Sequence, residues 1–291
     1  MSLRSPLPLH RDHRRSFADN RYVYAVVSRR SRGVSVGLNL NPDKVCNFDC
    51  VYCQVDRTTP GAEGGVDLDV LARELDDVLT RIRCGAFFED ERFRSTPPEL
   101  RRLNDIAFSG DGEPTTCPRF AAAVDVAAAA RRRHGLDAVK LVLITNATVL
   151  QRPAVVEGLR TLAANNGEVW AKLEAGTEAY YQRVERTTVP LRRVVDNITA
   201  AARLAPLVIQ ALFLRMHGEG PPPEELSAFC DRLNEITGAG GAVLRVQVYT
   251  VARRPAESFV AALPDAEVDA VADLVRRRTG LATEAFYGAS S

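Results

Sequence analysis

Short apolar runs and amphipathic segments alternate along the chain from residue 33 onward, and Gly, Pro or Asn flanks each of them. Runs rich in β-branched residues predict strands, and apolar residues that recur with a period of about 3.6 predict helices between them. We therefore expect repeated βα units. The six predicted strands cover residues 33–40, 104–110, 138–146, 168–176, 206–216 and 242–250.

The clearest predicted helix covers residues 67–85, where Asp67 can cap the first turn and Gly85 can end the last one. Residues 177–205 predict a helix that breaks before Pro190 and restarts after it, because proline removes a backbone donor. Two further helices are predicted, at residues 222–238 and 264–280.

Apolar strands joined by helices predict a parallel sheet whose outer face the helices cover. Six units are fewer than a closed barrel needs, so we expect an α/β fold, a partial (βα)6 TIM-like barrel, with function at the carboxyl ends of its strands. Residues 33–291 would form this domain with a short C-terminal extension, in which residues 281–288 can add an edge strand. Residues 1–32 are expected to be a basic N-terminal arm, and residues 86–103 a lid or a short added helix.

Composition narrows the function classes. The chain has 291 residues, 46% of them hydrophobic, and a net charge of +1, so it can bury a core and carries no strong field for nucleic acid. No stretch approaches the roughly 20 apolar residues of a membrane span, and we expect a cytoplasmic protein without membrane contact. The scattered Cys84, Cys117 and Cys230 are unlike the disulfide framework of a small secreted protein.

Three cysteines, Cys46, Cys50 and Cys53, follow the first predicted strand with the spacing C-x3-C-x2-C. A structural zinc site normally has four ligands, and no second cysteine pair or nearby His completes this one. A cubane iron-sulfur cluster takes one thiolate per iron, so three cysteines leave one iron able to bind another molecule. The pattern favours a cluster that does chemistry on its ligand. A noncatalytic iron-sulfur or zinc-binding module is the alternative from another class.

The segment CNFDCVYC, with Tyr52 directly before the third cysteine, resembles the cysteine motif of radical S-adenosylmethionine (SAM) enzymes. The resemblance implies a 4Fe-4S cluster on the three cysteines, whose open iron binds the methionine part of SAM. It also implies that one electron from the cluster cleaves SAM to methionine and a 5'-deoxyadenosyl radical, which abstracts hydrogen from an unidentified substrate. A flavodoxin or ferredoxin is then the expected electron donor.

Further segments resemble SAM-binding parts of the same family. SGDGEPT resembles the Gly-Gly-Glu motif that receives the amino group of SAM, with Asp111 in place of the first glycine and Gly112 and Glu113 after it. Glycines at a strand end let the backbone approach a ligand closely, which a Cβ atom would block. The resemblance also implies ribose contacts for Glu174 and, more weakly, for Asn146, for which helix capping or solvation is an equal alternative.

Lys172 and Arg215 are the candidates for substrate contact, because they lie toward the carboxyl ends of the fourth and fifth predicted strands. A guanidinium can bind a carboxylate or phosphate with two donors, and an ammonium acts as a compact point charge. Gln247, Tyr249 and Arg253 follow on the sixth strand and line the same predicted rim.

The stretches KLEAGTEAYYQRVERTT and TVARRPAES are similar to a wyosine-synthase-like branch of iron-sulfur oxidoreductases. The best-known members of that branch modify a guanosine beside the tRNA anticodon, by way of a lysine and a second cluster. This chain has no second cysteine triplet and no basic stripe suited to gripping RNA. We therefore expect an unidentified substrate and keep tRNA base modification as the alternative.

Overall fold

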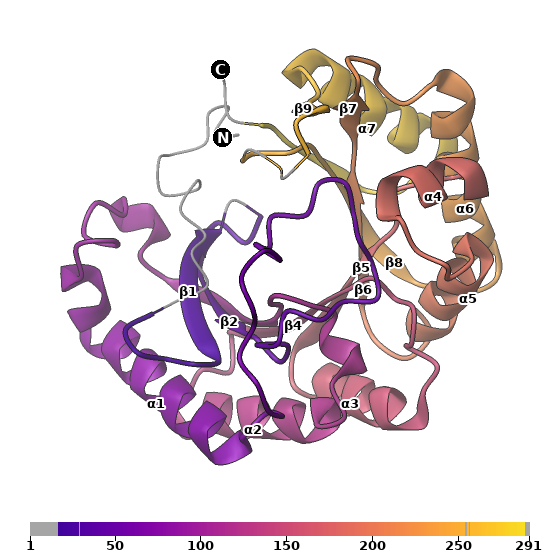
Figure 1. Cartoon of the computed structure of the whole chain (residues 1–291). Coiled ribbons are helices and arrows are strands. Elements are labelled where there is room, and N and C mark those ends of the chain that lie inside the picture. The colour runs from indigo at the N-terminus through magenta and orange to yellow at the C-terminus, as the bar shows by residue number, and fades with distance from the viewer. Residues whose placement is uncertain (1–16, 29, 254, 256, 289–291) are drawn as a thin grey trace.

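The computed structural model describes residues 17–28, 30–253, 255 and 257–288, which form a curled eight-stranded sheet with helices on its convex side (Figure 1). Its strands are β1 (Val23–Ser28), β2 (Gly33–Leu38), β3 (Leu103–Phe108), β4 (Lys140–Thr145), β5 (Gly167–Lys172), β6 (Leu207–Leu212), β8 (Val243–Tyr249) and β10 (Thr283–Phe286), in this spatial order. All neighbours pair in parallel except β1 and β2. The predicted α/β partial barrel is confirmed.

Within the described ranges, the α-helices are α1 (Leu68–Cys84), α2 (Phe120–Arg133), α3 (Pro153–Ala164), α4 (Glu178–Glu185), α5 (Leu191–Ala201), α6 (Pro223–Gly238) and α7 (Asp265–Thr279). Figure 1 shows them outside the curve of the sheet, whereas the long purple segment between β2 and α1 crosses its concave side. Because the main strands run in parallel, the loops at their carboxyl ends gather around one mouth.

Local capping sets the helix boundaries. The Asp67 side chain accepts hydrogen bonds from the N–H groups of Asp69 and Val70, at 2.9 and 3.1 Å, and starts α1. Gly85 ends α1 with a φ of 87°. Pro190 separates α4 from α5. These sequence predictions are confirmed.

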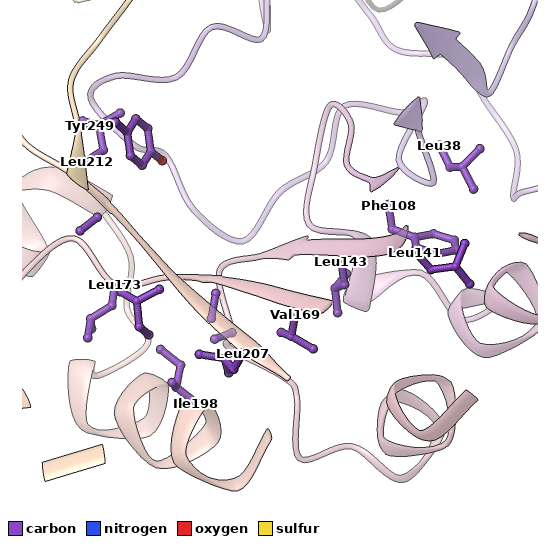
Figure 2. Close-up of a cluster of buried hydrophobic side chains, with 14 of the residues drawn as sticks. Leu38, Phe108, Leu141, Leu143, Val169, Leu173, Ile198, Leu207, Leu212 and Tyr249 are labelled. Carbon is purple, nitrogen blue, oxygen red and sulfur yellow. The ribbon is translucent and has the colours of Figure 1, made fainter. Parts of the chain in front are cut away.

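Alternate residues of each strand face opposite sides of the sheet. On the convex side, Leu141, Leu143 and Val169 are buried in the main core, which Figure 2 shows in close-up. A smaller buried cluster lies on the concave side and consists of Ala107, Val142, Trp170 and Val208. Burial on both faces explains why the strands are apolar almost throughout.

The sheet begins earlier than the sequence predicts. Strand β1 lies inside the range expected to be a basic arm, residues 1–32, and pairs with β2 along its whole length. Val23 and Val27 are each 1% exposed, so this valine-rich run contributes to the core. The prediction of an arm therefore does not hold for β1, and residues 1–16 and 29 lie outside the described residues.

The connection over residues 86–103 is not a lid. It contains two short 3-10 helices, η2 (Ala86–Glu89) and η3 (Pro98–Leu100). The carbonyl of Arg102 accepts a hydrogen bond from the N–H of Val34, at the amino end of β2. The segment therefore reaches the amino ends of the strands, opposite the mouth, and only the short-helix alternative holds.

The other edge of the sheet is formed by β10, which confirms the predicted edge strand. A separate antiparallel sheet joins β7 (Leu214–Met216) to β9 (Val260–Ala262) and takes the chain out of the main sheet after β6. In the described part of the chain, no helix has the length and apolar character that a bilayer crossing requires.

Candidate functional site

The three cysteines of the C-x3-C-x2-C motif lie between β2 and α1 and line one cavity of about 280 Å³ at the mouth of the half-barrel. Cys46, Cys50 and Cys53 are half-buried, and their thiols are free. Burial raises the pKa of Cys46 and of Cys50. Three unpaired sulfurs on one cavity wall suit a cluster that takes one thiolate per iron.

The cysteine loop is fastened to the carboxyl end of α4. The N–H of Asp49 donates to the carbonyl of Glu185 at 3.1 Å, and the N–H of Val51 donates to the carbonyl of Val184 at 2.9 Å. The loop thereby satisfies carbonyls that lack a partner within the helix. The position of the sulfurs thus depends on the helix that follows β5.

Arg57 is a cation beside the thiols that the sequence analysis did not single out. Its Nη2 lies 3.8 Å from the sulfur of Cys53, and its side chain lines the cavity. A nearby positive charge favours the thiolate, which is the form that binds metal. Arg57 stands in a loop without periodicity, so no sequence signal separates it from the other arginines.

The glycines of the SGDGEPT segment allow two loops to pack together. A Cβ atom added to Gly112 would lie 2.1 Å from the carbonyl oxygen of Val45, beside Cys46, and one added to Gly110 would lie 2.1 Å from Oδ1 of Asn39. These glycines therefore pack closely against the cysteine loop and the end of β2, and their predicted approach to a ligand stays a prediction.

The substitution Gly112→Ala is expected to displace the cysteine loop. Overpacking of this kind costs about 1–3 kcal/mol of unfolding free energy, and the displaced sulfurs should take up less iron. Urea unfolding and iron content after anaerobic reconstitution measure both effects. Gly65→Ala is the matched control, because nothing lies within 4 Å of its added Cβ. Equal iron uptake by the two variants would show that the packing does not position the thiols.

Asp111, in place of the motif's first glycine, is held by Asn39. The N–H of Asp111 donates to Oδ1 of Asn39 at 3.1 Å, and Nδ2 of Asn39 donates to Oδ2 of Asp111 at 2.7 Å. This reciprocal pair fixes the loop on the end of β2. The backbone donor at Asp111 already has a protein acceptor, so a SAM contact through it stays a prediction.

Glu113 lines the cavity although it is only 3% exposed. Its Oε2 accepts from the N–H of Asn146 at 2.7 Å, and its Oε1 accepts from Oγ1 of Thr145 at 2.7 Å. Burial raises the pKa of Glu113, and these hydrogen bonds oppose that rise. The carboxyl group ties the SGDGEPT segment to the end of β4 at the cavity wall.

Asn146 joins the turn after β4 to the cysteine loop. Its Nδ2 donates to Oδ1 of Asn47 at 2.8 Å, and its Oδ1 accepts from Oγ1 of Thr148 at 2.8 Å. Both ends of the amide are thus paired within the protein, and the side chain is buried, not solvated. Asn146 also lines the cavity, and its ribose contact stays a prediction.

Glu174 is buried behind Tyr52 and is not among the residues that line the cavity. Its carboxylate accepts hydrogen bonds from the hydroxyls of Tyr52 and Tyr249, the latter at 3.2 Å. Lys172 donates from Nζ to the Tyr52 hydroxyl at 3.0 Å and lies 3.9 Å from Glu174. In this arrangement Glu174 orients Tyr52, and its ribose contact stays a prediction.

Two carboxyl groups and one ammonium share this buried network. Glu185 is 2% exposed, and burial followed by the charge of Glu174 raises the pKa of Glu185 well above its usual range. Burial alone would lower the pKa of Lys172, but the charge of Glu174 raises it above its usual range. Lys172 therefore contributes a positive charge to the network beside the cavity, and its contact with substrate stays a prediction.

Residues 40–220 match the family model described as the Radical SAM superfamily. This segment is more than half of the 291 residues and includes the three cysteines, the SGDGEPT segment and Lys172. The chain belongs to the Radical SAM superfamily. The family expected from the cysteine motif is confirmed, and membership supports the use of SAM and an iron-sulfur cluster.

Two curated relatives of this radical SAM protein are UPF0026 proteins. The one from Methanocaldococcus jannaschii is 26% identical over 181 residues, which are 60% of this chain and 47% of the relative. The one from Helicobacter pylori strain J99 is 21% identical over 235 residues, which are 79% of this chain and 66% of the relative. The chain thus spans between about half and two thirds of the length of these relatives.

Two solved structures have a similar fold at 12% sequence identity. A radical SAM methyltransferase from Sphaerobacter thermophilus gives a TM-score of 0.62 over 91% of this chain and 69% of that one. TYW1 with a lysine-pyruvate adduct bound gives a TM-score of 0.54 over 84% of this chain and 73% of that one. At this identity the likeness shows the fold alone, which agrees with the half-barrel.

The donor set of the radical SAM site fits a cluster, because three free thiols line one cavity and iron-sulfur clusters take thiolates as ligands. Among the residues that the structure describes, no group of three His, Cys, Asp or Glu side chains that could hold a metal ion is found.

Arg215 is not brought to the radical SAM cavity, in contrast to the sequence prediction. The main-sheet strand ends at Leu212, and Arg215 belongs to β7 of the small second sheet. Its guanidinium donates to Glu267 and, at 2.6 Å, to the carbonyl of Gly218. The long apolar run over residues 206–216 hides this break, because both of its parts have the composition of a strand.

The concave side of the sheet supplies residues that the sequence analysis missed. Arg30, Asp105, Trp170 and Gln210 line the cavity below the cysteine loop. The period-2 alternation of β5 could have identified Trp170, because it faces the same side as Lys172. Of the other predicted rim residues, Tyr249 and Arg253 line the cavity, and Gln247 lies beneath it, bonded to Gln210.

The buried carboxyl group of Asp105 is expected to make the stability of the fold depend on pH. Burial raises its pKa from 3.8 to about 6, against a hydrogen bond from Ser35. A carboxyl whose pKa rises on folding stabilises the fold at low pH, and this contribution is lost as the pH rises through about 6. Asp105→Asn should therefore be up to about 3 kcal/mol more stable than the natural chain at pH 7, with the gain vanishing near pH 4.

Urea unfolding of both chains at a series of pH values measures this difference. A stability gain that is the same at every pH would contradict the assignment, because a titrating carboxyl cannot produce it. The Asn side chain keeps an oxygen that can accept the Ser35 hydrogen bond, so the comparison isolates the charge.

Proposed function

We propose that this chain is a radical SAM enzyme that binds a 4Fe-4S cluster through Cys46, Cys50 and Cys53 and cleaves SAM reductively. The observation that carries the proposal is the presence of three free, half-buried thiols on one wall of the cavity in a chain of this superfamily. Three protein ligands leave one iron for SAM.

The cluster would supply one electron to SAM, which breaks the bond between sulfur and C5' and yields methionine and a 5'-deoxyadenosyl radical. Protein groups would hold the reactants around it. Arg57 and Lys172 place positive charge near the thiolates, and Glu113 and Asp111 offer acidic groups in the same cavity, where an amino group can bind. The radical would abstract a hydrogen atom from a substrate in the half-barrel, giving 5'-deoxyadenosine and a substrate radical.

Formation of 5'-deoxyadenosine tests the proposal. The anaerobically reconstituted, chemically reduced protein should release it from SAM even without substrate, at a rate well above that of a variant in which all three cysteines are alanine. Chromatography with mass detection measures the product. A fully loaded, reducible cluster that yields no 5'-deoxyadenosine would rule the proposal out.

A further inference from the structure

The cavity continues below the cysteine loop into the interior of the half-barrel. We call this lower part the interior subsite and define it by Arg30, Asp105, Trp170, Gln210 and Tyr249, all of which line the cavity. They come from the turn after β1 and from strands β3, β5, β6 and β8. The side chains of Ile144 and Leu212 add apolar wall to the same space.

Arg30 is a cation placed over two aromatic rings. Its guanidinium carbon lies 6.0 Å from the centroid of the Trp170 ring and 5.0 Å from that of Tyr249. Within the described part of the chain, its guanidinium makes no hydrogen bond or close ion pair, and its charge acts on Asp105, whose pKa it lowers. Stacking leaves the in-plane N–H donors of an arginine available, and a planar fork of donors matches a carboxylate.

Two buried amides lie at the floor of this space. Gln210 and Gln247 are each 0% exposed, and Nε2 of Gln210 donates to Oε1 of Gln247 at 3.0 Å. Oε1 of Gln210 and Nε2 of Gln247 have no partner. Exchanging the oxygen and nitrogen positions of both amides does not change the number of unpaired atoms. One hydrogen bond still joins the two side chains, and one acceptor and one donor still have no partner. A fully buried amide with an unpaired atom facing a cavity indicates a polar ligand.

We propose that the interior subsite binds the carboxylate of a small substrate through Arg30 and a neighbouring hydroxyl or amino group of that substrate through Gln210. This inference rests on the proposed function, since it names the substrate class of the same site. The space holds one cation, Arg30, and one acidic group, Asp105. A carboxylate adds one negative charge to it, whereas a phosphate dianion would add two, with a larger repulsion from Asp105.

The sequence contains a single tryptophan, and Trp170 lies in the subsite, so its fluorescence reports binding there directly. The probes are lactate, its neutral analogue lactamide, and propionate, which lacks the hydroxyl. On the reconstituted full chain, lactate should change the fluorescence saturably and bind at least ten times more tightly than lactamide. It should also bind several-fold more tightly than propionate.

Arg30→Gln should weaken lactate binding at least tenfold, and Arg30→Lys should give an intermediate loss if the glutamine variant folds poorly. Gln210→Leu should remove the preference for lactate over propionate. Arg32→Gln is the matched control from the same turn, because Arg32 is exposed and lies 3.8 Å from Glu284. Arg32→Gln should bind lactate as tightly as the natural chain in the same fluorescence titration.

Equal binding of lactate and lactamide, unchanged binding by both Arg30 variants, or no saturable response to lactate would overturn the inference. The fluorescence titration does not depend on SAM cleavage. Carboxylate binding without 5'-deoxyadenosine formation would therefore refute the proposed function and leave the subsite standing, and the reverse result would refute the subsite alone.

Discussion

Replacement of Cys50 by alanine is expected to abolish the iron-sulfur cluster and SAM cleavage together while the half-barrel stays folded. One of three thiolates is lost, and two cannot hold a cubane of this kind stably. Iron content, visible absorbance and 5'-deoxyadenosine formation should all fall to the level of the triple-alanine variant. The fold should lose no more than about 1–2 kcal/mol, because the substitution removes one sulfur from a half-buried position.

Cys84→Ala is the matched control, because Cys84 is exposed at the end of α1, outside the cavity. It should bind iron and cleave SAM like the natural chain. The ligand assignment is contradicted if Cys50→Ala retains normal cleavage, or if Cys84→Ala loses as much iron as Cys50→Ala does.

The second large effect, a loss of folding stability, is expected for Lys172→Met. The ammonium of Lys172 is the cation of the buried network with Glu174 and Glu185, and its removal leaves the carboxylate of Glu174 without a counter-charge. Breaking a fully buried pair costs about 3–5 kcal/mol. Because 27% of the Lys172 side chain is exposed to the cavity, we expect a smaller loss of about 2–3 kcal/mol in the free energy of unfolding.

The double variant Lys172→Met with Glu174→Gln tests the cause of that loss. Neutralising Glu174 removes the uncompensated charge and keeps an oxygen that can accept from Tyr249. Urea unfolding should show the double variant within about 1 kcal/mol of the natural chain. If the double variant is instead as unstable as the two single changes added together, Lys172 acts by packing and not by charge.

The fold was predictable where local signals decide it. Asp67 and Gly85 fix the ends of α1, and Pro190 separates α4 from α5, because capping and proline act within a few residues. Strand β1 was not predicted, since its short valine-rich run follows a basic start and gains stability only by pairing with β2. The sequence predicts β6 and β7 as one strand, because the residue between them carries no turn or break signal where the chain leaves the main sheet.

The candidate site was predictable only in part. The cysteine spacing identified the thiols. All three lie in one loop, so the proposed set of cluster ligands forms a short motif that can be recognised in the sequence. The neighbours of Glu174 and the position of Arg30 depend on which side chains meet across the sheet, and that is set by strand register. Gly112 packs closely against Val45, which the sequence did not indicate, and its predicted approach to a ligand stays a prediction.

Mössbauer spectroscopy of the iron-labelled, anaerobically reconstituted protein, with and without SAM, tests the central claim most directly. The account predicts a cluster of four irons in which one iron differs from the other three and changes its signal when SAM is added. Four irons that are alike and insensitive to SAM would contradict it, as would a protein whose three cysteines hold one isolated metal ion.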